Sequence, residues 1–312
     1  ITILKPGLQT TIQSRPRTGL RHQGVTGGGA ADPLSLALAN RLVGNAWHAP
    51  ALEATLLGPT LRIDSSCALA ITGATCSATL GGRALAGHET VFAKPGDELH
   101  LGSAEADARI YIAFAGGIAV DDVLGSASTN LQAGFGGHGG RALQAGDVLQ
   151  LAGGRCDPLE TPAEFRLPSS SSRALRTCVA AETELLDDVS LAALFDTNWV
   201  IDRRADRMGL RLDGPALRVS SGGRMPSAAV FPGTIQCPED GAPYILSVDA
   251  GTVGGYPRIA QVARVDRHVL GQLRPGDHVR LLCREPDEAV EELRDKIAYW
   301  SEWLPDAAEV IG

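Results

Sequence analysis

The sequence predicts a mainly β protein with a few helices, and three observations support this fold class. Its 312 residues include 37 glycines and 18 prolines, which is typical of many short strands joined by turns. Apolar residues make up 44% of the chain but aromatic residues only 4%, so the core must be built from Leu, Val, Ile and Ala. Three segments combine a glycine–aspartate turn with alternating apolar residues, which predicts a turn entering a strand: PGDELHL (95–101), AGDVLQL (145–151) and PGDHVRL (275–281).

These turn-and-strand segments also indicate an internal duplication. GPTLRI (58–63) precedes the first of them, and the similar GPALRV (214–219) precedes the last. Chance recurrence is the alternative, because such units are common in β proteins. We expect an N-terminal β-rich domain over residues 1–160 and a C-terminal β-rich domain over 161–312, with the N-terminal strand paired in its own half or in the second. The boundary is expected in a segment rich in proline and serine, 156–176.

Three helices are expected. The first covers 32–45, where Asp32 is a suitable N-cap and Pro33 takes the first helical position. The second covers 185–195. The third, 285–304, opens with proline and acidic residues and keeps one face apolar along its length.

Composition and motifs argue against several classes of function. The net charge is -8 and no basic cluster occurs, which argues against binding to nucleic acid or anionic lipid. None of the three lysines follows a glycine, so there is no phosphate-binding loop, and none lies beside methionine, so this chain is not expected to carry biotin. Scattered cysteines and histidines predict reduced thiols and no metal site. Without a signal peptide or a long apolar run, we expect a cytoplasmic protein.

Two glycine-rich segments of the first half carry polar side chains. Residues 10–32 place Gln13 and Arg17 beside several glycines, a composition suited to binding a carboxylate or carbamate through a guanidinium. A solvated loop is the alternative. Residues 125–147 add hydroxyl and amide donors and His138, although a histidine among glycines is more often exposed than catalytic.

The second half holds the segment SVDAGTVGGYPRIA (247–260), with three glycines in five residues. The surrounding pattern predicts strand, turn, strand, glycine loop and strand, which would place Gln236 and Asp249 on neighbouring strands of one hairpin. The two side chains could then face a shared pocket. Arg207 is a candidate anion clamp, or equally a strand-face charge paired with a nearby aspartate.

Several motifs together resemble one known family. They occur in the family's order and span nearly the whole chain: GVTGGGAADPLSLALANRLVGN, AGGIAVDDVLGSAST, GFGGHGGRAL, DRMGLRLDGP, PGTIQCP, GGYPRIAQV and GQLRPGDHVR. The family is variously called KipA, allophanate hydrolase subunit 2 and the 5-oxoprolinase C subunit. It also forms half of the carboxyltransferase domain of urea carboxylase.

The resemblance implies two cyclophilin-like β-barrel halves and a KipI-type partner (the 5-oxoprolinase B subunit) that shares the active cleft. In prokaryotic 5-oxoprolinase the A subunit completes the ATP-dependent opening of 5-oxoproline. In urea carboxylase, carboxybiotin on another domain delivers the carboxyl group. The leading expectation is therefore the C subunit of a 5-oxoprolinase-like complex. The alternatives are a carboxyltransferase subunit acting with biotin on a partner, and a regulatory protein that binds a KipI-type chain.

Ten residues are the candidate site on this resemblance and on the chemistry of their side chains. We expect catalytic roles for Gln236, Asp249 and Tyr256, and substrate binding by Gln13, Arg17, Asp32, Arg207, Thr252, Gly254 and Gly255. For Asp32 the helix cap is the stronger expectation. Four polar residues usual in the family, an aspartate, an arginine, a glutamine and a threonine, are replaced by Ser14, Ala127, Gly251 and Val253. Pro16 replaces a usual glycine, while the scaffold glycines otherwise persist. This pattern suggests an altered substrate or reduced catalysis.

Overall fold

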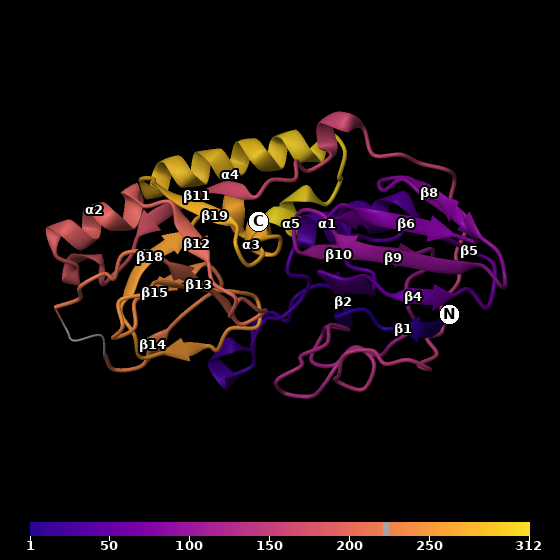
Figure 1. The fold of residues 1–312 in the computed structure, drawn as a ribbon, viewed down its shortest axis with the longest axis horizontal. Coiled ribbons are helices and arrows are strands. Elements are labelled where there is room, and N and C mark those ends of the chain that lie inside the picture. The colour runs from indigo at the N-terminus through magenta and orange to yellow at the C-terminus, as the bar shows by residue number, and fades with distance from the viewer. Residues whose placement is uncertain (221–224) are drawn as a thin grey trace. The chain divides into compact units, whose positions relative to one another are not determined.

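The structure is a computed structural model, and it describes residues 1–220 and 225–312. The chain forms two compact units (Figure 1). The first unit comprises Ile1–Arg17, Gly28–Ser169 and Trp300–Val310. The second comprises Thr18–Gly27, Ser170–Tyr299 and Ile311–Gly312. The mainly β fold class is confirmed, and most of the strands belong to the sheets described below.

The first unit contains two five-stranded antiparallel sheets. One has the order β1 (Thr2–Lys5), β4 (Thr60–Arg62), β9 (Glu98–Ala104), β6 (Cys76–Leu80), β7 (Arg83–Ala84). The other has the order β2 (Gln9–Gln13), β3 (Ala51–Thr55), β10 (Arg109–Phe114), β5 (Cys67–Gly73), β8 (Thr90–Ala93). The two N-terminal strands pair within the first unit, β1 with β4 and β2 with β3.

The described residues form five helices, which are distributed over the two units. Their bounds are α1 (Pro33–Leu42), α2 (Asp188–Asp196), α3 (Arg267–Leu270), α4 (Pro286–Ser301) and α5 (Ala307–Ile311), with the short 3-10 turns η1 (Arg21–Gln23), η2 (Ala163–Phe165), η3 (Thr183–Leu185) and η4 (Arg264–Asp266). The three helices expected from the sequence form within a few residues of the expected ends. Among the described residues, no helix is both long enough and apolar enough to cross a membrane.

Alternation along β10 explains how the first unit is layered. Ile110, Ile112 and Phe114 join the core that both sheets share, whereas Tyr111 and Ala113 pack with the apolar face of α1. Successive side chains of a strand point to opposite faces, so a fully buried strand must be apolar on both. The sheet of β10 is thus covered on both faces, by the other sheet and by α1.

The second unit is a closed seven-stranded barrel. Its strands follow the order β11 (Ser172–Val179), β18 (Arg258–Val262), β15 (Thr234–Gln236), β16 (Tyr244–Leu246), β13 (Gly209–Asp213), β12 (Trp199–Ile201), β19 (His278–Cys283), and β19 closes onto β11. Of the strand pairs in the described part of this barrel, β11–β19 is parallel and the others are antiparallel. A separate ribbon pairs β14 (Ala228–Ala229) with β17 (Val253–Gly254). Closure leaves the barrel without unpaired edges and encloses a core that includes Trp199, Leu212 and Ile245.

The glycine–aspartate turn recurs in both units with the same hydrogen bonds. In each copy the aspartate carboxylate accepts a bond from the backbone N–H three residues earlier, at 2.8, 2.8 and 3.0 Å for Asp97, Asp147 and Asp277. The preceding glycine donates its N–H to the carbonyl of a buried isoleucine: Ile63, Ile3 and Ile201 respectively. The repeated contacts support the interpretation that the two halves are related.

Candidate functional site

The glycine loop of the second unit connects β16 to β18 and contains β17. Gln236 lies beneath it, where a β-bulge shifts the register between β15 and β18. Its amide nitrogen donates to the carbonyl of Tyr256 at 3.1 Å. A Cβ added at Gly254 would lie 2.5 Å from that nitrogen, so glycine is needed for the close approach. Gln236 is buried and supports the loop through this bond.

Asp249 and Arg207 bind each other. The guanidinium donates to both carboxylate oxygens, at 2.7 and 3.0 Å, and both side chains are almost fully buried. The Asp249 backbone N–H also donates to the carbonyl of Arg207 at 2.9 Å. The structure therefore brings these two predicted residues together as a bidentate ion pair that fixes the loop to the start of β13. Neither side chain is free to act alone on a substrate.

Two hydroxyls of the loop remain available. Within the described part of the chain, no residue hydrogen-bonds to the hydroxyl of Thr252 or of Tyr256. The Tyr256 side chain is exposed, and Val253 beside it is more exposed still. The Thr252 carbonyl accepts from the backbone of Val230 at 3.2 Å, which holds the loop backbone while its side chains stay unbonded. These hydroxyls can donate to an oxygen of a small ligand.

A second ion pair anchors the far end of the loop, and our sequence reasoning missed it. Arg258 donates to both carboxylate oxygens of Glu182, at 2.7 and 2.5 Å, and to the carbonyl of Ala229 at 3.1 Å. The guanidinium lowers the pKa of Glu182 below its ordinary value. Arg258 directly follows the glycine loop in the motif GGYPRIA, so its position was a usable signal, but the sequence gives no sign of Glu182 as its partner.

Arg17 of the first unit is a structural residue. It is buried and donates to the backbone carbonyls of Val123, Ser126 and Ser128, at 3.0, 3.3 and 2.6 Å. Its guanidinium carbon lies 4.6 Å from the centre of the Phe135 ring. The side chain thus organises the second glycine-rich segment, and its contact with a substrate carboxylate stays a prediction.

The side chains of Gln13 and Asp32 differ in whether their oxygen atoms have hydrogen-bond partners within the described residues. The carboxylate of Asp32 accepts from the backbone N–H groups of Leu34 and Ser35, both at 3.1 Å, which is the expected N-cap of α1. The amide nitrogen of Gln13 donates to Thr11 at 2.9 Å. The Gln13 oxygen is buried and has no hydrogen-bond partner among the described residues, so it can accept a bond from a ligand.

A buried network under the N-terminus of α1 was also missed. The Tyr111 hydroxyl donates to Glu53 at 2.7 Å and accepts from the backbone of Asp32 at 2.8 Å, while Glu53 also accepts from the backbone of Ala31 at 2.9 Å. Burial, with the neighbouring carboxylates, raises the pKa of Tyr111 well above its usual value and keeps it a donor. The network holds the glycine-rich turn before α1 in place.

The replaced family residues lie in two kinds of environment. Ala127 is fully buried, so an arginine at this position would not fit the present packing. The Pro16 backbone lies 2.9 Å from a Cβ placed on Gly29, which packs the two segments closely. Gly251 and Val253, by contrast, lie in the exposed glycine loop.

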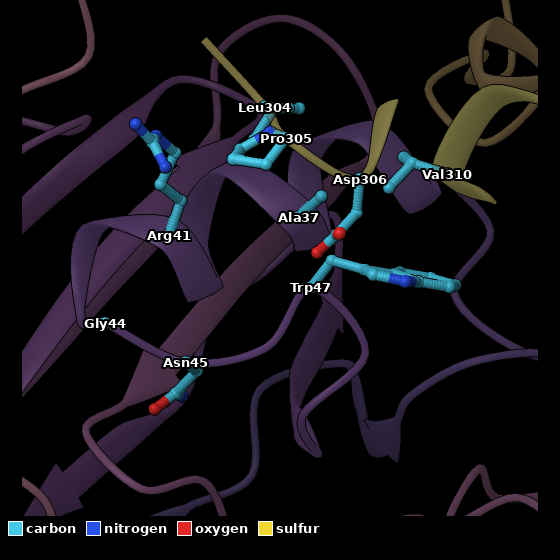
Figure 2. Close-up of a pocket in the computed structure, with 9 residues that line it drawn as sticks. All are labelled: Ala37, Arg41, Gly44, Asn45, Trp47, Leu304, Pro305, Asp306 and Val310. Carbon is cyan, nitrogen blue, oxygen red and sulfur yellow. The ribbon is translucent and has the colours of Figure 1, made fainter. Parts of the chain in front are cut away.

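A pocket of about 220 Å³ in the first unit is lined by none of the ten candidates (Figure 2). It lies between the C-terminal end of α1 and the segment that contains α5. The Trp47 indole donates to Glu309 at 3.0 Å, and the guanidinium carbon of Arg41 lies 4.4 Å from the Trp303 ring centre. These contacts hold the C-terminal segment on α1. In the described residues no group of three or more His, Cys, Asp or Glu side chains could hold a metal ion, and all six cysteines are free.

Comparisons with known proteins identify the relatives of this chain. Residues 23–282 match the family described as "Carboxyltransferase domain, subdomain A and B". The chain is 34% identical to the C subunit of 5-oxoprolinase from Escherichia coli over 302 residues, which cover 97% of each chain. It is 32% identical to urea amidolyase of Saccharomyces cerevisiae, covering 95% of this chain but 17% of that protein. The crystal structure of K. lactis urea amidolyase superposes with a TM-score of 0.89 at 30% identity, covering 95% of this chain and 19% of that one.

Proposed function

We propose that this chain, which belongs to the family of carboxyltransferase domains (subdomains A and B), is the C subunit of an ATP-dependent, amide-hydrolysing complex of the 5-oxoprolinase type. One observation carries the proposal. The match to the 5-oxoprolinase C subunit runs end to end on both chains, whereas urea amidolyase contains the same region as a small part of a much longer protein. The relative that this chain covers over nearly its whole length is described as one subunit of 5-oxoprolinase, and this supports the proposal of a subunit that acts with others.

In this proposal the glycine loop binds the amide group. The hydroxyls of Thr252 and Tyr256 donate to the carbonyl oxygen, on which negative charge develops when the amide is attacked. Gln236 and the pair of Arg207 with Asp249 are positioning residues that hold the loop backbone.

The three candidate residues of the first unit, Gln13, Arg17 and Asp32, have other roles in this proposal. The unbonded oxygen of Gln13 is a suitable acceptor for an N–H group of a ligand. Arg17 and Asp32 keep their glycine-rich segments folded through bonds to the backbone. Of these three residues, only Gln13 is therefore proposed to touch a ligand.

We assign ATP binding to the partner chains, of which one is KipI-like and corresponds to the B subunit. The sequence holds no glycine-rich loop followed by lysine, the usual cradle for the phosphates of ATP. The A subunit completes the reaction in this scheme. The chain works only in the complex in this proposal, because among the described residues no base hydrogen-bonds to the hydroxyl of Thr252 or Tyr256 and could activate it as a nucleophile.

One alternative function has a specific observation in its favour. The family description and the close superposition on urea amidolyase fit a carboxyltransferase subunit that receives a carboxyl group from biotin on a partner. A second alternative, a regulatory protein that binds a KipI-type chain without turnover, is favoured by the apolar Gly251 and Val253 in the loop.

Reconstitution separates these functions. The chain is co-expressed with the A and B subunits of a 5-oxoprolinase, and phosphate release is measured with ATP and 5-oxoproline. Release that needs all three chains and both substrates supports the proposal. Loss of turnover on adding avidin supports the carboxyltransferase. Tight binding to the B subunit with no turnover of 5-oxoproline or urea supports the regulator.

A further inference from the structure

A cavity of about 440 Å³ lies in the first unit, at the turn between β5 and β6. The end of β5, the start of β6, residues 86–88 and residues 166–169 line it. None of the ten candidate residues belongs to this lining. Its volume is in the range of sites that bind small molecules. Part of its wall consists of small or apolar side chains: Ile71, Ala74, Ala78, Ala86 and Leu167.

His88 lines this cavity with an unbonded ring on an unusual backbone. Its φ is 67°, a value that residues other than glycine seldom adopt. The backbone holds this conformation because its N–H donates to the carbonyl of Ile71 at 2.8 Å and its carbonyl accepts from Thr161 at 2.9 Å. The Nδ1 atom is buried, and neither ring nitrogen has a hydrogen-bond partner in the described part of the chain. Burial, and to a smaller extent the positive charge of Arg166, lowers the pKa of His88 to about 4, so the neutral ring offers one donor and one acceptor near pH 7.

The backbone of Thr161 joins His88 to Arg166, a second residue of the lining. The N–H of Thr161 donates to the carbonyl of His88, and the carbonyl of Thr161 accepts from Nε of Arg166 at 3.0 Å. The Nη2 atom of Arg166 donates to Glu160 at 2.5 Å, which leaves Nη1 without a hydrogen-bond partner among the described residues. An imidazole and a guanidinium with unused hydrogen-bonding capacity are therefore held at the same cavity.

The other polar side chains of the lining are engaged, exposed or uncharged. The hydroxyl of Thr72 donates to a backbone carbonyl of α1 at 2.7 Å, and that of Ser169 donates to Asp107 at 2.6 Å. Thr75 is exposed. Burial raises the pKa of Cys76 to about 11, so this residue stays an uncharged thiol. The chemistry of a ligand is therefore set by the imidazole and the guanidinium.

The charge balance of the cavity favours an uncharged ligand. Among the described residues that line it, Arg166 is the one charged side chain near pH 7, and Glu160 already pairs with it. A carboxylate ligand would lose hydration on entry and add a negative charge without a free counter-charge. An amide carries no charge, and its C=O and N–H complement a guanidinium donor and an imidazole acceptor.

We propose that the cavity lined by His88 and Arg166 is a further site, in the first unit, for a small uncharged ligand that carries an amide group. The amide carbonyl accepts from Nη1 of Arg166, and an amide N–H donates to the unprotonated ring nitrogen of His88. The apolar remainder of the ligand packs on the alanine side chains of the wall. The glycine loop belongs to the other unit, and this inference does not rest on the proposed function.

The test compares propionamide with propionate, which have the same shape and differ in charge. Each is titrated into the isotope-labelled full chain near pH 7 at constant ionic strength, and backbone amide resonances are followed by NMR. Propionamide should shift the resonances of residues 71–76 and 86–88 and reach saturation. Propionate should bind at least about 10-fold more weakly, because its charge must be desolvated.

Substitutions in the lining test the two polar groups. His88→Gly removes the imidazole, and glycine adopts the positive φ without strain, so propionamide binding should weaken at least about 10-fold in a folded chain. The matched control is Leu124→Gly, at a residue with a φ of 56° outside the lining, which should bind as the wild type does. Arg166→Met should also weaken binding about 10-fold, and it should fold because its ion pair with Glu160 is largely exposed.

Several results would overturn the site. They are the absence of a saturable shift in residues 71–76 and 86–88, propionate binding as tight as that of propionamide, and an unchanged affinity in His88→Gly. Because the measurement needs neither partner chains nor turnover, its failure leaves the outcome of the reconstitution untouched.

Discussion

The glycine-rich segments of the two units look alike in sequence but are held in different ways. In the first unit, the guanidinium of Arg17 donates to backbone carbonyls and the carboxylate of Asp32 accepts from backbone N–H groups. In the second, the charges pair with one another, as in Arg207 with Asp249, and hold the backbone indirectly. The second arrangement leaves the hydroxyls of Thr252 and Tyr256 without a hydrogen-bond partner among residues 1–220 and 225–312, on a loop where Tyr256 is exposed. A charged side chain beside glycines is therefore a poor sign of a binding site until its partner is known.

The largest effect is expected from breaking the buried ion pair of the second unit. Arg207→Met should lower the free energy of unfolding by about 4 kcal/mol, because Asp249 is left as an uncompensated buried charge. Urea denaturation followed by circular dichroism measures this loss.

The control for this prediction removes both charges. Arg207→Met combined with Asp249→Leu should regain most of the lost stability, since no unpaired charge remains. A double variant as unstable as Arg207→Met would show that the charges matter through other partners.

A somewhat smaller loss of stability is expected from a substitution in the first unit. Arg17→Met should lower the free energy of unfolding by about 3 kcal/mol, because it leaves buried backbone carbonyls without donors. The matched control is Arg15→Met, whose exposed pair with Asp122 should contribute less than about 1 kcal/mol. Equal losses in the two variants, measured in urea, would remove the structural role of Arg17.

Acid should affect the two units differently. The pKa of Glu182 is depressed below its ordinary value of 4.5, so its pairing with Arg258 stabilises fully above about pH 4.5 and is lost as the pH falls below that. Arg17 binds carbonyls, which do not titrate. We expect hydrogen exchange, corrected for intrinsic rates, to increase in 251–258 on acidification but not in 123–135. Parallel increases in both segments would contradict this contrast.

The fold and the local caps were predictable because their signals are short-range. Asp32 followed by Pro33 marked the start of α1, and the glycine–aspartate turns marked the strands that follow them. The candidate site was harder. Whether Asp249 accepts a proton or binds Arg207 depends on a contact between residues 42 positions apart, which one sequence does not reveal. Likewise Glu53 meets Tyr111 only because β3 and β10 pair in one register.

The central claim is that the glycine loop of the second unit carries the chemistry, and Tyr256→Phe tests it most directly. The variant should change the free energy of unfolding by less than about 0.5 kcal/mol, because the hydroxyl is exposed and unbonded within the described residues. In the reconstituted complex its 5-oxoproline-dependent phosphate release should fall about 100-fold. Tyr299→Phe is the control, with the same 43% exposure on α4, and should retain full turnover. Full turnover by Tyr256→Phe in the same assay would contradict the claim.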